Sequence, residues 1–265
     1  MSSITTDQGI IHYEVLGHGR PVILLHGWLG SWGLWQESMA YLSQFYRTYA
    51  LDFWGFGESG KKRDSYAIQD FVLLVDQFME RLGIDQAPLV GHSMGGTVSL
   101  SVAAQFPHRT PKVVVISSPI VGSSLSLPLK LAGNQFVSAL LFKMMWAFRA
   151  GLKIAAPTLC SDPNFPEMIS RDLTSTTVDS FSRSISSLRR TDLRPLLPNL
   201  KIPIMGMYGD RDNLLDPRQR QILLNGVPHA KIVRWQNARH FVMLDEPKDF
   251  KEKLKSFLDE GVPSV

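Results

Sequence analysis

The sequence has little cysteine and no long uninterrupted apolar run. A single cysteine, Cys160, stands among 265 residues, so an intrachain disulfide is excluded and a reducing compartment is expected. The first ten residues, MSSITTDQGI, lack the basic and apolar regions of a signal peptide. The longest apolar stretch is uncharged only over residues 131–142, which is too short to cross a bilayer. We therefore expect a cytoplasmic protein without a membrane span.

The chain also has only a small excess of positive over negative side chains. The chain has 28 Lys and Arg against 24 Asp and Glu, a net charge of +4. The densest basic cluster, residues 61–63, is followed directly by Asp64, which is typical of a solvated loop rather than a nucleic-acid interface. We expect no nucleic-acid partner, and homo-oligomer formation is left open.

Motifs for cofactors and metals are missing or incomplete. There is no Walker A and no HExxH motif, and the histidines lack metal-ligand spacing, so we expect no metal. Gly55, Gly57 and Gly60 match Gly-x-Gly-x-x-Gly. A dinucleotide fingerprint should open a helix at once, however, and KKRDSY follows here. No cofactor is expected.

What the sequence does contain is an alternation of short apolar runs and helical patterns. Hydrophobic residues make up 44% of the chain, enough for one sizeable core. The strand-like runs are 10–16, 21–27, 47–52, 87–92, 112–117, 202–209 and 230–235, and the helical patterns fall near 33–45, 66–83, 94–106, 216–225 and 247–259. Continuous apolar strands that alternate with helices predict an α/β fold with a mostly parallel sheet covered on both faces.

One region breaks this alternation. Residues 119–194 show no strand pattern and are Ser-rich, Met-rich and helical in parts. An insertion between two strands of an α/β sheet is a candidate cap over a site at the carboxyl ends of the strands. We therefore expect a core formed by residues 1–118 and 195–265, with a helical cap at 119–194.

The cap contains the Met- and aromatic-rich run LFKMMWAFRAG, residues 141–151. Packing is the default for such a stripe, although a membrane-surface helix, a dimer contact or the underside of a lid are alternatives. Packing can include a substrate pocket, so the expected substrate contacts are Met144, Met145 and Trp146, together with Trp28 and Trp54.

A serine lies between glycines at the end of one apolar run. The stretch APLVGHSMGGTVSL contains Gly91-His92-Ser93-Met94-Gly95. A serine on a sharp strand-to-helix turn takes a strained backbone conformation, and side chains two residues away on either side would clash. Such a turn exposes the Ser93 hydroxyl and puts the N–H of Met94 at a helix start, where an oxyanion is stabilised. Tight packing without catalysis is the alternative.

A serine nucleophile needs a base and an acid that orients the base. His240 follows the last apolar run and precedes the final helical pattern, so we expect its loop to return to the carboxyl edge of the sheet. The loop YGDRDNLLDP after the preceding run offers Asp210, Asp212 and Asp216. The chain order is then Ser, Asp, His, as in α/β-hydrolases.

At this point the sequence resembles the α/β-hydrolase superfamily, in particular its small serine-esterase and cofactor-free haloperoxidase-like branch. The motifs that carry the resemblance are LLHGWLGS (24–31), LDFWGFGESG (51–60), GHSMGG (91–96), YGDRDNLL (208–215) and RHFVMLDEP (239–247). The resemblance implies an eight-stranded, mostly parallel sheet with a helical cap insertion.

The resemblance also implies roles for individual residues. Ser93 would be the nucleophile and His240 the base. Asp212 would be the acid, because the family's acid lies three residues after the glycine of this loop, and Asp210 is the alternative. The backbone N–H groups of Trp28 and Met94 would form the oxyanion hole.

We therefore interpret the chain as a carboxylesterase-type serine hydrolase that acts on a small-molecule ester. Alternatives on the same triad are perhydrolysis, carbon–carbon bond hydrolysis and amide hydrolysis. A ligand-binding receptor that retains the fold is the non-enzyme alternative.

Overall fold

The sheet of this protein has eight strands. In the computed structural model, which describes residues 2–6 and 8–261, the strand order is β1-β2-β4-β3-β5-β6-β7-β8. The strands are β1 (Ser2–Thr6), β2 (Gly9–Leu16), β3 (Pro21–Leu25), β4 (Arg47–Leu51), β5 (Leu89–His92), β6 (Val113–Ile116), β7 (Ile204–Gly209) and β8 (Lys231–Trp235). β1 and β2 pair antiparallel with their neighbours, and all pairs from β4 to β8 are parallel. The expected mostly parallel, eight-stranded sheet is confirmed.

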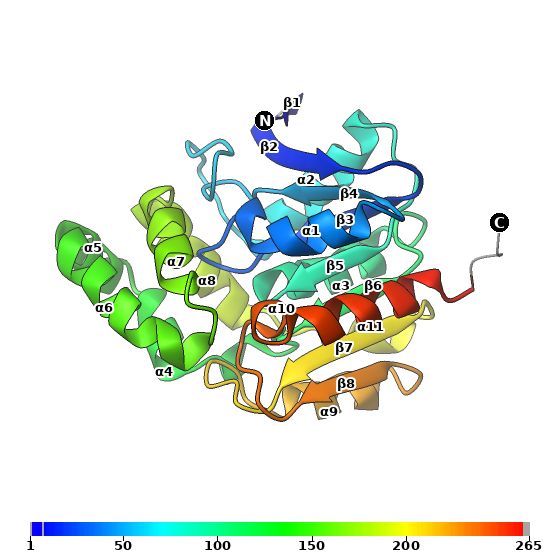
Figure 1. Cartoon of the computed structure of the whole chain (residues 1–265). Coiled ribbons are helices and arrows are strands. Elements are labelled where there is room, and N and C mark those ends of the chain that lie inside the picture. The colour runs from blue at the N-terminus through cyan, green and yellow to red at the C-terminus, as the bar shows by residue number, and fades with distance from the viewer. Residues whose placement is uncertain (1, 7, 262–265) are drawn as a thin grey trace.

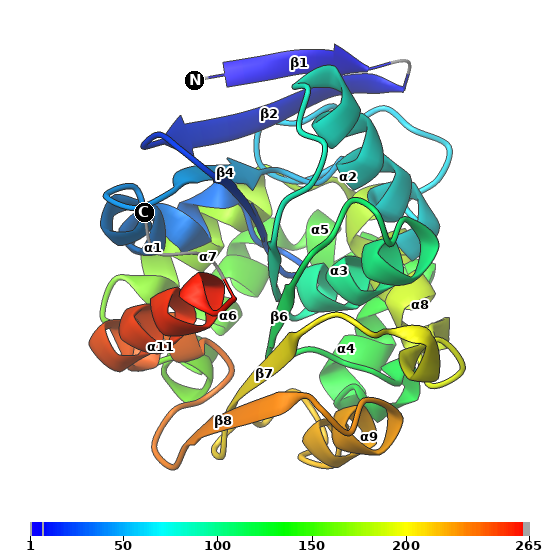
Figure 2. The ribbon, with the colours of Figure 1, turned by 90° about the vertical axis from the view of Figure 1, so that its right-hand side faces the viewer.

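Helices cover both faces of the sheet. Figure 2 shows α1 and α11 on one face and α2, α3 and α9 on the other. Their bounds are α1 (Gln36–Leu42), α2 (Ile68–Arg81), α3 (Met94–Gln105), α9 (Gln219–Gly226), α10 (Val242–Asp245) and α11 (Pro247–Asp259). The central strands β5, β6 and β7 are buried at every residue, as expected for a parallel sheet that is covered on both sides.

Five helices lie between β6 and β7, within the segment 119–194. They are α4 (Leu127–Ala132), α5 (Gln135–Lys143), α6 (Met145–Leu159), α7 (Phe165–Thr174) and α8 (Val178–Arg190). Figure 1 shows this helical insertion as a separate layer at the end of the sheet toward which the β7 arrow points, with α5 and α6 outermost. The insertion therefore lies over the carboxyl ends of the parallel strands.

One difference from the sequence expectations concerns an edge of the sheet. Strand β1 was not predicted, because its sequence SSITT is too polar to form an apolar run.

Among residues 2–6 and 8–261, no helix is both long and apolar enough to span a membrane.

Candidate active site

Ser93 lies on the tight turn between β5 and α3. Its backbone angles are φ 51° and ψ −117°, a conformation that costs a residue with a side chain about 1–3 kcal/mol. A Cβ added to Gly91 would lie 2.3 Å from the backbone of Gly95, and one added to Gly95 would lie 2.3 Å from the Leu25 carbonyl oxygen. Both glycines are therefore required by close backbone contacts, as the sequence argument anticipated.

A third glycine of this turn was not singled out from the sequence. A Cβ on Gly96 would lie 1.9 Å from the Ser118 hydroxyl oxygen, which belongs to the loop after β6. The N–H of Ser93 donates to the carbonyl oxygen of Ile116 at 2.8 Å. The turn is thus held against the neighbouring strand, and this support keeps the strained serine in place.

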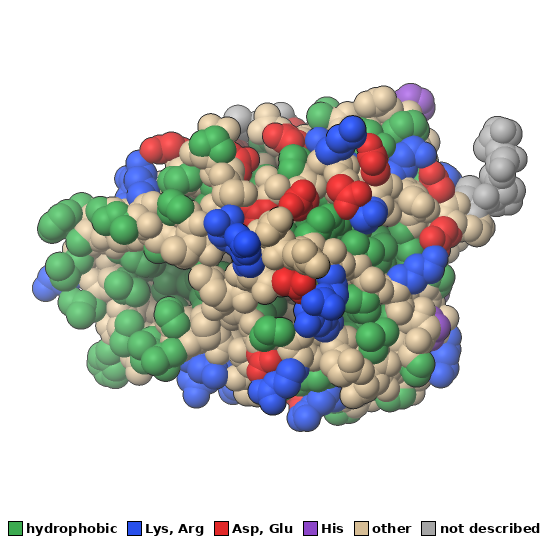
Figure 3. All heavy atoms as spheres, turned by 60° about the horizontal axis from the view of Figure 1, so that its bottom comes forward, with side chains coloured by type: hydrophobic (Ala, Val, Ile, Leu, Met, Phe, Trp, Pro, Cys, Tyr) green, Lys and Arg blue, Asp and Glu red, His purple; other side chains and the backbone are tan. Residues whose placement is uncertain are grey.

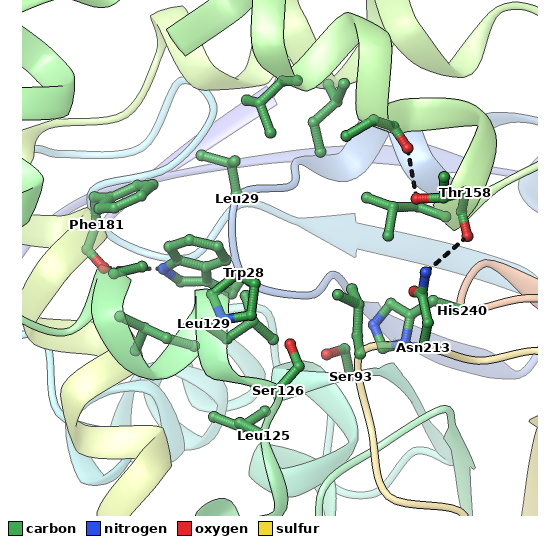
Figure 4. A pocket seen from close by; sticks show the side chains of 18 of the residues that line it. Trp28, Leu29, Ser93, Leu125, Ser126, Leu129, Thr158, Phe181, Asn213 and His240 are labelled. Carbon is green, nitrogen blue, oxygen red and sulfur yellow. Dashed lines mark hydrogen bonds between the residues drawn. The ribbon is translucent and has the colours of Figure 1, made fainter.

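His240 and Asp212 come together from the loops after β8 and β7. The distance from His240 Nδ1 to Asp212 Oδ2 is 2.8 Å, and the side chains are only 4% and 10% exposed. The other carboxylate oxygen, Asp212 Oδ1, accepts the N–H groups of Leu214 at 2.9 Å and Leu215 at 3.2 Å. With Nδ1 donating to the carboxylate, Nε2 of the imidazole is left to accept a proton. Ser93 and His240 line the same cavity (Figure 4).

The other two aspartates of the same loop have different partners. Asp210 binds Arg234 at 2.8 Å and Arg220 at 2.9 Å, and the hydrogen bond from Arg234 lowers the pKa of Asp210. Asp216 pairs with Arg218 at 2.5 Å, which lowers the pKa of Asp216. Of the three carboxylates left open by the sequence, Asp212 is the one that the fold brings to His240.

Two further histidines support the site without facing solvent. His92 donates from Nε2 to the carbonyl oxygen of His240 at 3.1 Å, and burial holds the pKa of His92 well below its ordinary value. Nε2 of His26 accepts the N–H of Phe53 at 2.9 Å, while Nδ1 donates to the Gly27 carbonyl at 2.7 Å. Burial also lowers the pKa of His26. Both histidines are therefore neutral hydrogen-bonding groups that hold backbone segments.

The two expected oxyanion donors flank Ser93. Met94 is the first residue of α3, and the loop with Trp28 begins at Gly27, where an added Cβ would lie 3.1 Å from Ser93 Cβ. Within residues 2–6 and 8–261, no acceptor takes the backbone N–H of Trp28 or of Met94. The Trp28 indole donates to the carbonyl oxygen of Phe181 at 2.9 Å, so the loop is tied to α8 of the insertion.

A second tie joins this loop to the insertion and was missed from the sequence. The Ser31 hydroxyl donates to Asp172 Oδ1 on α7 at 3.0 Å. Burial raises the pKa of Asp172 to about 6, against a smaller opposing effect of Arg171. A carboxylate in an ordinary helical pattern gives no local signal that it will be buried beside a loop more than a hundred residues away.

Asp52 holds the chain around it through both of its carboxylate oxygens. Its Oδ1 accepts the N–H of Trp32 at 2.7 Å. Its Oδ2 lies 2.8 Å from His12 Nδ1 and accepts the N–H of Glu58 at 2.9 Å. Hydrogen bonding to Asp52 raises the pKa of His12.

The cavity between the sheet and the insertion has a volume of about 400 Å³. It is lined mainly by apolar side chains of the insertion, and its polar wall consists of Ser93, His240 and a few neutral groups. The lining residues are Trp28, Leu29, His92, Ser93, Leu125, Ser126, Pro128, Leu129, Ala132, Leu141, Phe148, Leu152, Ala155, Thr158, Leu159, Ile169, Phe181, Ile185, Leu188, Asn213, Leu214, His240 and Phe241. No Lys, Arg, Asp or Glu is among these described residues.

The expected substrate contacts agree with this cavity at only one position. Trp28 lines it, but Trp54, Met144, Met145 and Trp146 do not, so the expectation for these four is corrected. Trp54 is fully buried elsewhere, with its ring 3.6 Å from the Arg63 guanidinium carbon. The inward face of α6 carries Phe148, Leu152, Ala155 and Leu159 instead. The composition of residues 141–151 could not show which side of α6 faces the cavity.

A serine on a strand-to-helix turn after β5, with an Asp–His pair on the loops after β7 and β8, defines an α/β-hydrolase-fold protein. A family model described as "alpha/beta hydrolase fold" matches residues 20–150. The protein is similar to 3-oxoadipate enol-lactonase 2 of Acinetobacter baylyi, with 24% identity over 97% of this chain and 96% of that protein.

Solved structures agree with this assignment. The enol-lactonase from Burkholderia xenovorans superposes with a TM-score of 0.85 at 21% identity, covering 98% of this chain and 100% of that one. The bromoperoxidase from Bacillus anthracis gives a TM-score of 0.85 at 22% identity, over 95% of this chain and 96% of that one. The protein therefore has the α/β-hydrolase fold, as the motifs predicted.

Proposed function

We propose that this protein is a serine hydrolase that cleaves carboxylic esters with a neutral, apolar acyl or alcohol group. The observation that carries the proposal is one shared cavity: Ser93 and the Asp212-bonded His240 both line it, and apolar side chains of the insertion form most of the rest.

The mechanism follows the roles that the geometry supports. Ser93 attacks the ester carbonyl while His240 takes its proton, and Asp212 stabilises the imidazolium that forms. The N–H groups of Trp28 and Met94 bind the developing oxyanion, at about 3–4 kcal/mol per donor. His240 returns the proton to the leaving alcohol, and water then hydrolyses the acyl-enzyme with His240 again acting as the base.

The lining of the cavity supports the choice of substrate class. A carboxylate buried among these residues would lose its hydration without gaining a cationic partner, which is costly. The cavity volume of about 400 Å³ lies within the usual range for small-molecule sites. The neutral hydroxyl, amide and imidazole groups are sufficient to orient an uncharged ester.

We also propose that the segment 119–194 acts as a cap. Its contacts with the core support this role, because the Asn213 side chain donates to the Thr158 carbonyl at 3.3 Å (Figure 4). In addition, Ser161 donates twice to Asp245 Oδ1, at 2.6 Å in each case. These bonds lie at the end of α6, beside the loops that carry the acid and the base.

The test is hydrolysis of p-nitrophenyl esters from acetate to palmitate by the wild type and by Ser93→Ala. We expect turnover that is lost in the variant, with a medium chain length preferred. Labelling with a fluorophosphonate probe, followed by mass spectrometry, should modify Ser93. Absence of both turnover and labelling in a folded protein would refute the proposal, whereas labelling without turnover would favour the receptor alternative.

A further inference from the structure

The outward surface of the insertion is unusually apolar. Seven of the ten exposed large hydrophobic side chains of the described residues lie on α4, α5 and α6 or between them. They are Leu127, Leu131, Phe136, Leu140, Met144, Trp146 and Ile154, which we call the cap surface. Phe136 is 88%, Ile154 81% and Trp146 77% exposed. Figure 3 shows hydrophobic side chains gathered at this end of the molecule. Such a patch marks an interaction site.

Helical spacing shows that the cap surface is a second apolar face of these helices. Leu127 and Leu131 are four residues apart on α4, as are Phe136 and Leu140 on α5, so each pair lies on one side of its helix. Other residues of the same helices line the cavity. A helix that is apolar all round is normally buried, yet within the described chain nothing covers these outer side chains.

The charges of this segment identify the kind of partner. Residues 127–159 contain Lys130, Lys143, Arg149 and Lys153 but no Asp or Glu, and of these four Lys153 is paired with Glu167 of α7 at 2.6 Å. Lys143 is exposed and, like Lys130, has no carboxylate within ion-pair distance in the described part of the chain. Apolar helices with Lys and Arg at their borders are typical of segments that lie in the interface of an anionic membrane.

We propose that the cap surface docks this protein on an anionic lipid bilayer. A second copy of the chain fits the surface less well. A twofold contact would bring the same patch of each subunit together, so Lys130 and Lys143 would face cations without acidic partners. Anionic headgroups neutralise these charges, and the acyl region accepts Phe136, Trp146 and Ile154.

The position of the cavity gives this docking a consequence that rests on the proposed function. Pro128, Ala155 and Thr158 line the cavity and are also exposed, so the cavity opens beside them. Leu127 and Ile154 of the cap surface directly precede Pro128 and Ala155 in the chain. A docked protein has this opening against the lipid, and an apolar ester dissolved in the bilayer reaches Ser93 without crossing water.

The test is sedimentation with vesicles of phosphatidylcholine alone or with about one-third phosphatidylglycerol, at low and physiological salt. The wild type should bind the anionic vesicles and lose binding as salt rises. The variant Phe136→Ser/Leu140→Ser/Ile154→Ser should bind at least about tenfold more weakly, because interfacial binding scales with buried apolar area. Lys143→Glu should weaken binding to anionic vesicles and leave the weak binding to neutral vesicles unchanged.

The matched control changes three exposed hydrophobic side chains outside the insertion. Ile10, Leu16 and Phe45 are 54%, 44% and 44% exposed, and the variant Ile10→Ser/Leu16→Ser/Phe45→Ser should bind vesicles like the wild type. Circular dichroism and p-nitrophenyl acetate hydrolysis check that both triple variants remain folded. Binding is also measured with Ser93→Ala, because docking does not need turnover and a failure of the esterase proposal would leave this result unaffected.

Three outcomes would overturn the proposal. One is a wild type that binds neither vesicle. Another is equal binding by the cap-surface and control variants. The third is a wild-type dimer that the cap-surface variant converts to monomer, without vesicle binding by either, which would assign the surface to self-association. A supporting result is quenching of Trp146 fluorescence by brominated phosphatidylglycerol, measured as the difference from Trp146→Phe.

Discussion

Replacing Asp172 by Asn should stabilise this protein, and by more at pH 8 than at pH 4.5. The Asp172 carboxylate is only 4% exposed, accepts the Ser31 hydroxyl at 3.0 Å and lies 3.2 Å from Arg171 Nε. Burial nevertheless dominates and raises the pKa of Asp172 from 3.8 to about 6. Between about pH 4 and 6, the folded state therefore keeps a proton on Asp172 that the unfolded chain releases.

The magnitude follows from this pKa difference. Because the folded protein binds more protons between about pH 4 and 6, stability falls as the pH rises through that window. A pKa that rises from 3.8 to about 6 costs about 3 kcal/mol at pH 8 and about 1 kcal/mol at pH 4.5. The Asp172→Asn substitution removes this cost and keeps an oxygen for Ser31. The attraction of Arg171 lowers this pKa and is already included in the value of about 6, so its loss is not subtracted a second time.

We therefore expect a gain of about 3 kcal/mol at pH 8, which raises Tm by roughly 6–12 °C in a chain of this size. At pH 4.5 the gain falls to about 1 kcal/mol, or roughly 2–4 °C. Thermal unfolding followed by circular dichroism at both pH values measures this. Asp179→Asn, at a carboxylate 60% exposed, is the control. A Tm of the Asp172→Asn variant that falls at pH 8, or changes equally at both pH values, would refute the dominance of burial.

Three further predictions concern the site and its surroundings. Asp212→Asn should lower kcat for ester hydrolysis by about 10³–10⁴-fold. Asp210→Asn, which loses only surface ion pairs, should change kcat less than about threefold. Equal losses of kcat in steady-state assays of the two variants would contradict the assignment of Asp212 as the acid. Gly91→Ala should prevent stable folding, since its Cβ would lie 2.3 Å from backbone atoms. Gly151→Ala, with nothing within 4 Å, should raise the free energy of unfolding by up to about 1 kcal/mol, and denaturant titration compares the two. Burial raises the pKa of Cys160 to about 12, so Ellman's reagent should label it only in denaturant, and rapid labelling of the native protein would show that the thiol is accessible.

The sheet and the serine turn could be predicted from local sequence. Buried parallel strands need continuous apolar runs, and seven of the eight strands were visible in that way. The turn at Ser93 needs glycine at position 91 because a Cβ there would meet the backbone of Gly95, whereas the close contact of Gly95 is with Leu25 on β3. The apolar runs and the contact of Gly91 act over a few residues, so they leave a readable local pattern.

The partners of those residues depended on the tertiary structure. Three aspartates share one loop, and the family resemblance pointed to Asp212; the fold shows the contact itself, in which Asp212 meets His240 while the other two bind arginines. The rotational phase of α6 likewise decided that Phe148 lines the cavity and that Trp146 faces outward.

The sequence by itself thus determined where most strands lie along the chain, that Ser93 sits on a strained turn, and which kinds of residue are available to activate it. The tertiary structure decided which of them meet, which side of each insertion helix faces the cavity, and that Asp172 is buried beside Ser31. The physical reason is that contacts between distant segments depend on how the insertion helices are oriented on the sheet, and no local pattern encodes that orientation.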